Sequence, residues 1–386
     1  MRLRRSRLLD LLRMSLILLT ACVVDAHVAE AQTPVIQQPH ERQWQIGPFV
    51  RPPEGDPVIE PRPQSTFVDP ISGKTVHWEV LHTFNPAAIV RNGKIYVLYR
   101  AEDDTGVNQI GGHTSRLGLA ESQDGIHFKR LPVPVLFPAD DSQKEREWPG
   151  GVEDPRIVES EDGTYVLTYT QWNRITYSVG IATSRDLIHW TKFGPAFLDA
   201  AGGKYASLKY KSAGIVTQIK DGRLLAARID DRYWMYWGEG EIHLATSADL
   251  LHWTPVEGKD GRVLVVLGKR PGHFDSGFPE VGPPPLLTDR GILVMNNGKN
   301  DPQDGDPELG PNAYAAGQAL FAPDDPSRLL GRADKPFLKP EMPFEKTGQY
   351  AAGTTFAEGL VAFKGKWFLY YGCADSLVGV AVADLQ

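Results

Sequence analysis

The sequence predicts an all-β protein, specifically a single five-bladed β-propeller with an N-terminal arm. Two observations lead to this prediction. The 386 residues include 38 Gly and 30 Pro together with 9 Trp, 13 Tyr and 15 Phe, which is typical of short strands joined by many turns. In addition, two sequence patterns recur along the chain, and each of them marks a turn followed by a strand.

The first pattern is a turn containing Gly followed by a strand rich in apolar and aromatic residues. Asn-Gly and Asp-Gly between apolar runs are strong hairpin signals, because both central residues of such a turn need positive φ. The pattern occurs five times, with its turn glycines at Gly93, Gly163, Gly222, Gly291 and Gly365. A unit of about 60 to 70 residues with two hairpins is typical of one propeller blade with long loops.

The second pattern is Ser-x-Asp followed, three residues after the Asp, by a His-aromatic pair. It occurs three times, with its aspartates at Asp124, Asp186 and Asp249. Ser, Asp and His together could indicate a catalytic set, but one active site does not need three copies. We therefore expect these residues to cap turns through hydrogen bonds to their own backbone.

The N-terminus is typical of an export signal, because five arginines precede an apolar stretch from Met14 to Val24. The sequence is compatible with two alternative processing sites. The residues ending at Cys22 resemble a bacterial lipobox, which would place a lipid on Cys22, whereas small residues before Gln32 fit ordinary cleavage. We expect an exported protein, either secreted or a periplasmic or cell-surface lipoprotein. A membrane tether is expected only through a lipidated Cys22.

These features divide the chain into three parts. Residues 1–31 are the predicted signal peptide, or a lipoprotein signal that ends before Cys22. Residues 32–79 contain many prolines and form the predicted arm. Residues 80–386 form the predicted catalytic propeller of five blades.

Charge and cysteine content exclude several classes of function. The net charge is −7, and no basic block follows the first residues, so we expect no nucleic-acid partner. Two cysteines cannot make a disulfide scaffold or a cysteine-based zinc site. We expect no cofactor and no metal; calcium at Asp301, Asp304 and Asp306 is a weaker alternative, because the EF-hand spacing is missing.

Chemistry is expected where the first strand of each blade faces the central channel. These strands begin with polar residues at comparable positions, namely Asn85, Glu153 and Asp154, Lys211 and Ser212, Glu280, and Glu358. Carboxylates around one axis raise one another's pKa, which suits a general acid at neutral pH. The alternative is that these acids are structural and pair with Arg156 or Lys211.

The same strands resemble those of glycoside hydrolase family 130, from about residue 80 to the C-terminus. The resemblance is carried in order by Phe84-Asn85-Pro86-Ala87, Ser115-Arg116-Leu117-Gly118, Gly150-Gly151-Val152-Glu153-Asp154-Pro155-Arg156, Gly282-Pro283-Pro284 and Tyr370-Tyr371-Gly372-Cys373-Ala374-Asp375. That family consists of five-bladed propellers acting on β-mannosides, and it contains inverting phosphorylases and inverting hydrolases. The resemblance therefore implies a β-mannoside oligosaccharide or glycan as the substrate.

The resemblance also implies roles for single residues. Asp154 is the expected general acid, which protonates the leaving oxygen through a mannose hydroxyl. Glu239 and Glu280 match the two glutamates that position the attacking water in the hydrolase branch, whose members are β-1,2-mannosidases. Glu241 is a rival to Glu239, because the two would share one face of a strand.

Among the tryptophans, Trp172, Trp234 and Trp237 lie outside the repeats and are candidates for stacking on sugars.

The leading prediction is an exported, inverting β-mannosidase of the 1,2-linked type. A phosphorylase that binds phosphate through Lys209, Lys211, Arg228 or Arg232 is the first alternative, and a glycan-binding propeller without catalysis is the second. The candidate catalytic residues are Asp154, Glu239 and Glu280, and the candidate substrate-binding residues are Asn85, Arg100, Asp103, Arg116, Arg156, Lys211, Trp237, Asp275, Glu358 and Asp375.

Overall fold

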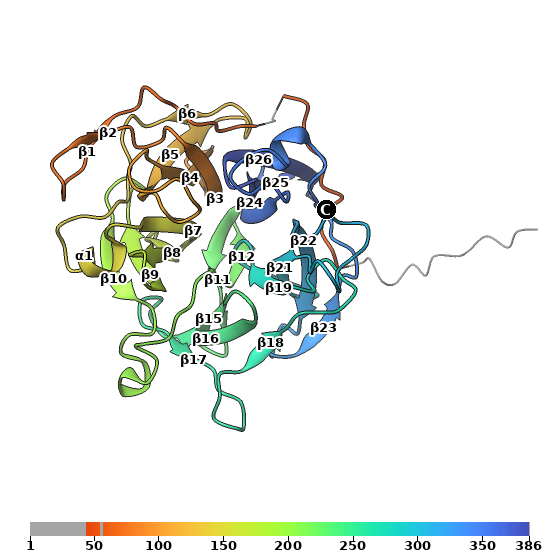
Figure 1. The fold of residues 1–386 in the computed structure, drawn as a ribbon. Helices are drawn as coiled ribbons and strands as arrows, with labels where there is room; N and C mark the ends of the chain where they lie inside the picture. The colour runs from red at the N-terminus through yellow and green to blue at the C-terminus, as the bar shows by residue number, and fades with distance from the viewer. Residues whose placement is uncertain (1–43, 55–56, 386) are drawn as a thin grey trace, which may run out of the picture. The chain divides into compact units, whose positions relative to one another are not determined.

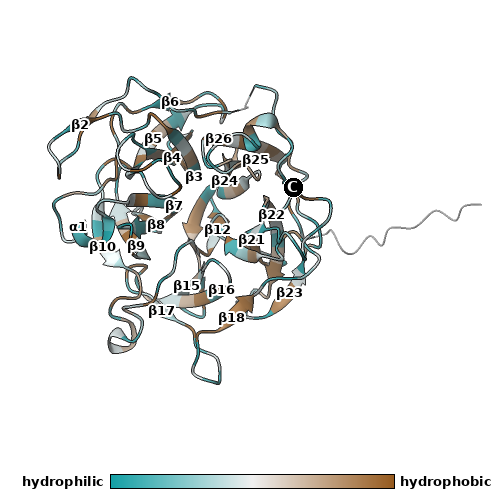
Figure 2. Cartoon of the chain, in the orientation of Figure 1, coloured by the Kyte–Doolittle hydropathy of each residue, from teal (hydrophilic) through white to brown (hydrophobic). Residues whose placement is uncertain are grey.

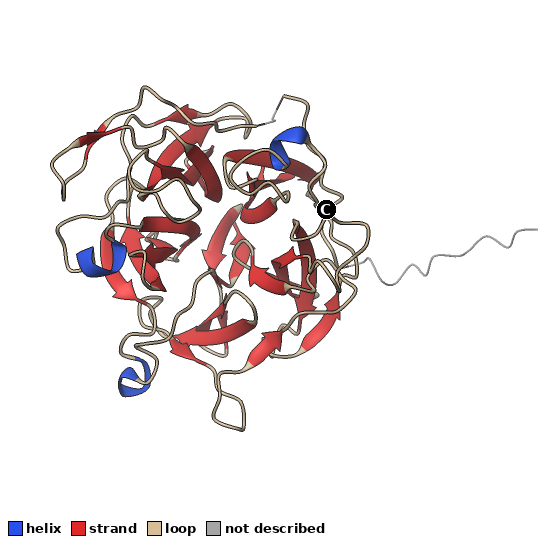
Figure 3. Cartoon of the chain, in the orientation of Figure 1, coloured by secondary structure: helices blue, strands red, loops and turns tan. Residues whose placement is uncertain are grey.

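The computed structural model describes residues 44–54 and 57–385. The predicted signal peptide and Cys22 lie outside these residues. The described chain is all-β, as predicted, with only three helical turns: α1 (Lys144–Glu147), η1 (Ala200–Gly203) and η2 (Pro343–Glu345) (Figure 3). None of these helices is long and apolar enough to span a membrane.

Strands account for most of the regular structure, and they are short, as the turn-rich composition predicts. In chain order they are β1 (Phe67–Val68), β2 (Thr75–Val76), β3 (His82–Arg91), β4 (Lys94–Glu102), β5 (Ser115–Ser122), β6 (Lys129–Arg130), β7 (Gly151–Glu159), β8 (Tyr165–Trp172), β9 (Tyr177–Ser184), β10 (Thr191–Pro195), β11 (Ala213–Ile215), β12 (Thr217–Lys220), β13 (Arg223–Ala226), β14 (Arg228–Ile229), β15 (Arg232–Trp237), β16 (Ile242–Ser247), β17 (Thr254–Pro255), β18 (Val265–Leu267), β19 (Phe278–Val281), β20 (Leu286–Thr288), β21 (Gly291–Lys299), β22 (Tyr314–Phe321), β23 (Leu329–Arg332), β24 (Thr355–Phe363), β25 (Lys366–Cys373) and β26 (Leu377–Asp384).

The five hairpins predicted from the first repeat are confirmed. They are β3–β4, β7–β8, β12–β13, β20–β21 and β24–β25, and each pair is antiparallel. The turn between β3 and β4 explains why Asn-Gly occurs there, because Asn92 has φ 51° and Gly93 has φ 70°. Positive φ at both central residues matches the right-handed twist of the two strands.

The turns of the second repeat are structural, as predicted. Asp124 Oδ1 accepts hydrogen bonds from the backbone amides of Ile126 and His127, both at 2.9 Å. The turns at Asp186 and Asp249 have the same bonds. Three identical turns at the surface therefore account for this Ser, Asp and His pattern without catalysis.

The antiparallel pairs fall into five successive groups along the described chain, formed by β3–β6, β7–β10, β11–β18, β19–β23 and β24–β26. Short parallel pairs join neighbouring groups, for example Ser115 with Gly151 and Thr217 with Leu286. Figure 1 shows β3, β7, β11 and β24 next to one another, each at the inner end of its group. The described strands form no closed sheet, so the five-bladed propeller stays a prediction.

The core consists of apolar clusters that pack between successive groups. One cluster joins Leu98 of β4 to Leu167 of β8, and another joins Tyr236 of β15 to Phe321 of β22. A further cluster contains Val97 of the first group together with residues of β25 and β26, so the last group packs against the first. Figure 2 shows apolar segments on strands such as β18 and β23, whereas the charged helix α1 is hydrophilic.

The described part of the predicted arm packs along the last strand. Val50 and Ile59 form single β-bridges with Val382 and Val378 of β26. Within the arm, Trp78 is fully buried. The arm is thus in contact with the fifth group, while its boundary at residue 79 stays a prediction.

Candidate active site

Three inner strands have an irregularity at the position where the sequence predicts a functional side chain. The pairing of β3 with β4 shifts around Asn85, that of β7 with β8 around Asp154, and that of β24 with β25 around Glu358. Such a bulge redirects a side chain that regular alternation would point elsewhere. Asn85 and Asp154 both have φ 46°, a costly value for residues other than Gly that is common at functional sites.

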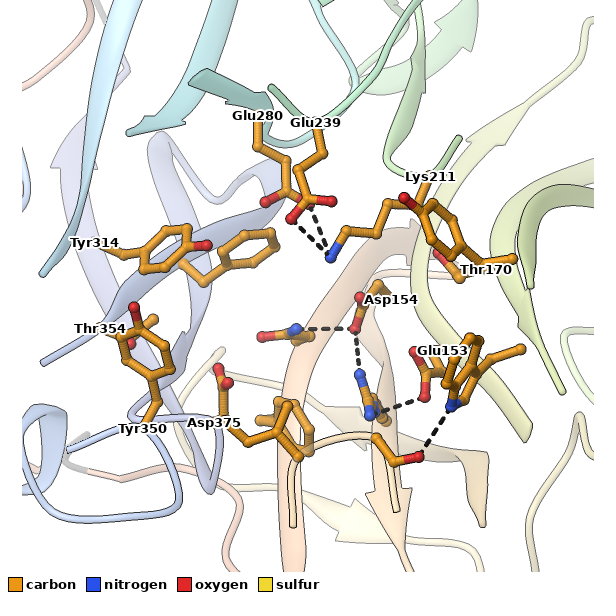
Figure 4. Close-up of a pocket in the computed structure, with 18 residues that line it drawn as sticks. Glu153, Asp154, Thr170, Lys211, Glu239, Glu280, Tyr314, Tyr350, Thr354 and Asp375 are labelled. Atoms are coloured by element: carbon orange, nitrogen blue, oxygen red, sulfur yellow. Dashed lines mark hydrogen bonds and ion pairs between the residues drawn. The ribbon is translucent and has the colours of Figure 1, made fainter. Parts of the chain in front are cut away.

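These strand ends line a cavity of about 310 Å³ (Figure 4). Its walls combine carboxylates, two cations and a set of aromatic rings, so they offer a ligand both hydrogen-bonding groups and apolar surface. The lining residues are Phe84, Asn85, Arg100, Ile110, Gly111, Glu153, Asp154, Thr170, Trp172, Tyr177, Lys211, Glu239, Glu280, Tyr314, Tyr350, Thr354, Phe356 and Asp375.

Asp154 lies at the centre of this group of side chains (Figure 4). Its Oδ1 accepts a hydrogen bond of 2.8 Å from Asn85 Nδ2 and one of 3.2 Å from Arg100 Nη1. Burial acts to raise the pKa of Asp154, but the charges of Arg100 and Lys211 and the hydrogen bond from Asn85 outweigh it and lower this pKa. The expectation that mutual repulsion would raise the pKa of the acid is therefore wrong for Asp154.

Arg100 holds three carboxylates at once. Its Nη2 lies 2.6 Å from Glu102 and 2.9 Å from Glu153, in addition to the contact of Nη1 with Asp154. Burial, with the negative charges of Asp154 and Glu102, raises the pKa of Glu153 to about 7 against the pull of Arg100. The pKa values of this adjacent pair are therefore shifted in opposite directions, upward for Glu153 and downward for Asp154.

A second charged group lies on the opposite side of the cavity (Figure 4). Lys211 Nζ is 3.2 Å from Glu239 and 3.8 Å from Glu280. A single β-bridge holds the two glutamates side by side, and Ser212 Oγ donates a hydrogen bond to Glu280. Burial and the charge of Glu239 raise the pKa of Glu280 to about 7, although Lys211 acts to lower it.

Asp375 completes the set of carboxylates in the cavity. It follows β25 with φ 52°, and burial raises its pKa to about 6, assisted by the charges of Asp154 and Glu102. The structure thus brings together nine of the residues singled out from the sequence, which are Asn85, Arg100, Glu153, Asp154, Trp172, Lys211, Glu239, Glu280 and Asp375. Glu241, the rival of Glu239, is exposed and does not line the cavity.

Four predicted residues form buried ion pairs outside the cavity lining. Arg116 lies 2.5 Å from Asp103 and 2.8 Å from Asp69, and all three side chains are buried. Arg156 lies 2.7 Å from Glu358, and it donates hydrogen bonds to the backbone oxygens of Val281 and Gly282. A buried charge without a partner is strongly destabilising, and each of these charges has a partner of opposite sign. The pairs therefore stabilise the packing of the inner strands.

Two other predicted residues also lie away from the cavity. Asp275 is fully buried and forms ion pairs with Arg270 and Arg332. Trp237 is buried, and its ring packs against those of Phe197 and Tyr210, with centroids 4.9 and 5.4 Å apart. Their positions give them a packing role in the described structure.

Sequence reasoning missed one side of the cavity. Tyr314 and Tyr350 lie beside each other there, with ring centroids 5.4 Å apart, and Thr354 is close by (Figure 4). These residues come from loops and strand ends that follow no repeat. In the sequence, only the presence of aromatic residues in segments outside the two repeats could have indicated this side of the cavity.

Comparison with known proteins gives a consistent set of relatives. The model of glycoside hydrolase family 130, described as beta-1,4-mannooligosaccharide phosphorylase, matches residues 56–386. The chain is 31% identical over 313 residues to 1,2-beta-oligomannan phosphorylase of Thermoanaerobacter sp. (strain X514), covering 80% of this chain and 92% of that protein.

Two solved structures are more similar in sequence. One was reported with the finding that the GH130 family of mannoside phosphorylases contains glycoside hydrolases that target beta-1,2 mannosidic linkages in Candida mannan. It is 51% identical with a TM-score of 0.87, covering 89% of this chain and 95% of that chain. The other is a glycosyl hydrolase from Bacteroides ovatus, 51% identical with a TM-score of 0.86, covering 88% of this chain and 95% of that chain.

Proposed function

Since the chain belongs to glycoside hydrolase family 130, we propose that it is an inverting hydrolase that releases mannose from β-mannosides, in particular β-1,2-linked ones. The observation that carries this proposal is the arrangement of Lys211 between Glu239 and Glu280. Two carboxylates already face this cation, so the group has no excess of positive charge for a phosphate dianion. Water beside two carboxylates is instead made more nucleophilic.

The placement of the other cations supports water over phosphate as the nucleophile. Of the four phosphate ligands considered for a phosphorylase, only Lys211 lines the cavity. Lys209, Arg228 and Arg232 are exposed. A phosphorylase needs several cationic donors at one place, because each charge-assisted hydrogen bond to the phosphate has to offset its loss of water.

In the proposed reaction, Asp154 protonates the leaving oxygen through a hydroxyl of the mannose. Glu239 and Glu280 position the water on the opposite face of the sugar, as inversion requires. Glu280 is the candidate base, because a pKa of about 7 suits proton uptake near neutral pH. Asn85, Arg100 and Asp375 are the candidate ligands of the mannose.

The relatives support a β-mannoside substrate, but they are divided over the type of reaction. The phosphorylase relative acts, by its name, on a 1,2-beta-oligomannan, and it is 31% identical to this chain. The structure described with hydrolases of beta-1,2 mannosidic linkages is 51% identical. Phosphorolysis is the second candidate function, and the phosphorylase relative is the observation that favours it.

The proposal includes the five-bladed propeller and the export of the protein. The propeller is supported by the clusters between successive groups, and above all by the cluster that joins the fifth group to the first. Export is supported by the arginines and apolar stretch of the N-terminus. A hydrolase that acts outside the cell also has no need to conserve a sugar phosphate.

Sugar release from β-1,2-mannobiose, with and without inorganic phosphate, tests the proposal. The protein is expected to release mannose at the same rate in both solutions, and the Asp154→Asn variant is expected to release almost none. A rate that depends on phosphate would establish the phosphorylase instead. Binding of mannobiose without turnover in either solution would indicate the glycan-binding alternative.

A further inference from the structure

One wall of the cavity has no role in the reaction described above. Thr170 and Trp172 are two residues apart on β8, so their side chains lie on the same face of the strand, and both line the cavity. Tyr177 on β9 pairs directly with Trp172, and their ring centroids are 6.4 Å apart. A hydroxyl and two aromatic rings therefore form a continuous surface, which we call the β8 wall.

Trp172 is held firmly in this wall. Its Nε1 donates a hydrogen bond of 2.9 Å to the backbone oxygen of Gly111. A Cβ at position 150 would lie 2.3 Å from Trp172 Cδ1, so the indole ring occupies space that only Gly150 leaves open. A ring fixed in this way loses little conformational entropy when a ligand packs on it.

Thr170 provides the second observation that points to a ligand. It is 2% exposed, and its Oγ1 has no hydrogen-bond partner in the described structure. By contrast, Thr168 on the same strand donates a hydrogen bond of 2.6 Å to the backbone oxygen of Ala213. A buried hydroxyl without a partner is destabilising, and a hydroxyl of a bound ligand would offset this cost.

The position of the wall relative to the acid indicates which part of a substrate it contacts. Thr170 pairs with Glu153, the neighbour of Asp154, across β7 and β8. In an inverting glycosidase the leaving group lies on the side of the acid, and the water lies on the opposite face of the sugar. A sugar unit on the leaving side therefore meets the β8 wall and not the pair of glutamates.

We propose that the β8 wall is a subsite for the sugar unit on the leaving-group side of the scissile bond. Trp172 packs against the C–H face of that pyranose, and Thr170 exchanges a hydrogen bond with one of its hydroxyls. This subsite rests on the proposed function, since it assumes that Asp154 is the acid.

Binding to proteins that carry the Asp154→Asn substitution tests the subsite without turnover. Calorimetric affinities are measured for mannose and β-1,2-mannobiose, with Trp172→Ala, Trp172→Phe, Thr170→Val or Thr170→Ser added. Trp172→Ala is expected to weaken mannobiose binding about tenfold, as loss of an aromatic contact worth about 1.4 kcal/mol does, while mannose binding is unchanged. Trp172→Phe and Thr170→Ser are expected to keep most of the affinity for mannobiose, whereas Thr170→Val loses part of it.

The control is Ile175→Ala, which alters an 81% exposed side chain that does not line the cavity. This variant is expected to bind both sugars like its parent. Equal weakening of mannose and mannobiose by Trp172→Ala, or no weakening of either, would overturn the subsite alone. If the Asp154→Asn protein bound neither sugar, both the subsite and the proposed function would be overturned.

Discussion

Arg100 Nη1 lies 3.2 Å from Asp154 Oδ1, while Nη2 of the same guanidinium contacts Glu102 and Glu153. One cation thus serves three buried carboxylates, which cannot all be ionised at low cost. Glu153 is the one whose pKa rises to about 7, and Asp154 is the one whose pKa falls. The proposed acid is therefore held in place by Arg100 but must take up its proton against that charge.

Replacement of Asp154 by Asn should remove turnover and preserve the fold. The amide has the same shape but cannot deliver a proton, so kcat is expected to fall by about 10² to 10⁴. Steady-state kinetics on β-1,2-mannobiose and circular dichroism measure the two effects. Asp384→Asn, at a side chain that is 87% exposed, is the matched control and should behave like the parent.

Removal of the positive charge at Lys211 should move the pH profile upward. Lys211 lowers the pKa of both Asp154 and Glu280, so Lys211→Met should raise the pKa of the acid and of the base. Both limbs of the profile of kcat/KM against pH are then expected at higher pH. Lys211→Arg keeps the charge and should leave both limbs near their original positions, and a downward shift in Lys211→Met would contradict this electrostatic account.

Stability should decrease as the pH rises from about 5 to about 7. Glu153 and Glu280 have pKa values of about 7 in the folded protein, against an ordinary value of 4.5. The folded state therefore binds more protons than the unfolded state in this window, and the free energy of unfolding falls as pH rises. The midpoint of thermal unfolding measures this effect, and Glu280→Gln should make its pH dependence weaker. A midpoint that rises across the window would show that these carboxylates are not protonated in the fold.

The position of Asn85 depends on a glycine that is distant in sequence. A Cβ at position 372 would lie 2.1 Å from Asn85 Oδ1, so Gly372→Ala should displace this side chain and break its bond to Asp154. A hydrogen bond to a charged group contributes about 1.5–3 kcal/mol, and kcat/KM is expected to fall by roughly 10 to 100 times. Gly268→Ala, where a Cβ meets no atom within 4 Å, is the control. Equal kinetics of the two variants would rule out a role for the Asn85–Asp154 bond.

The parts of the fold that follow from local chemistry were predictable. The turn at Asn92 and Gly93 needs positive φ at both residues, and Asn-Gly is the dipeptide most typical of such a turn. Asn85 and Asp154 were found because they occupy matching places at the start of inner strands. The bulges that direct both side chains into one cavity then explain why those places matter.

The parts that depend on distant partners were not predictable. Arg116 belongs to a motif beside the cavity, but its partners Asp69 and Asp103 keep it buried outside the lining. The lowered pKa of Asp154 depends on Arg100, which comes from another strand. Tyr314 and Tyr350 come from segments without a repeat, so their meeting at the cavity is known only from the structure.

The central claim is that water, positioned by Glu239 and Glu280, is the nucleophile. Proton NMR of the first product formed from β-1,2-mannobiose in a phosphate-buffered solution tests this claim most directly. The account predicts free mannose released as the α-anomer, because inversion of a β-linkage gives the α-configuration. Formation of α-mannose 1-phosphate would contradict it.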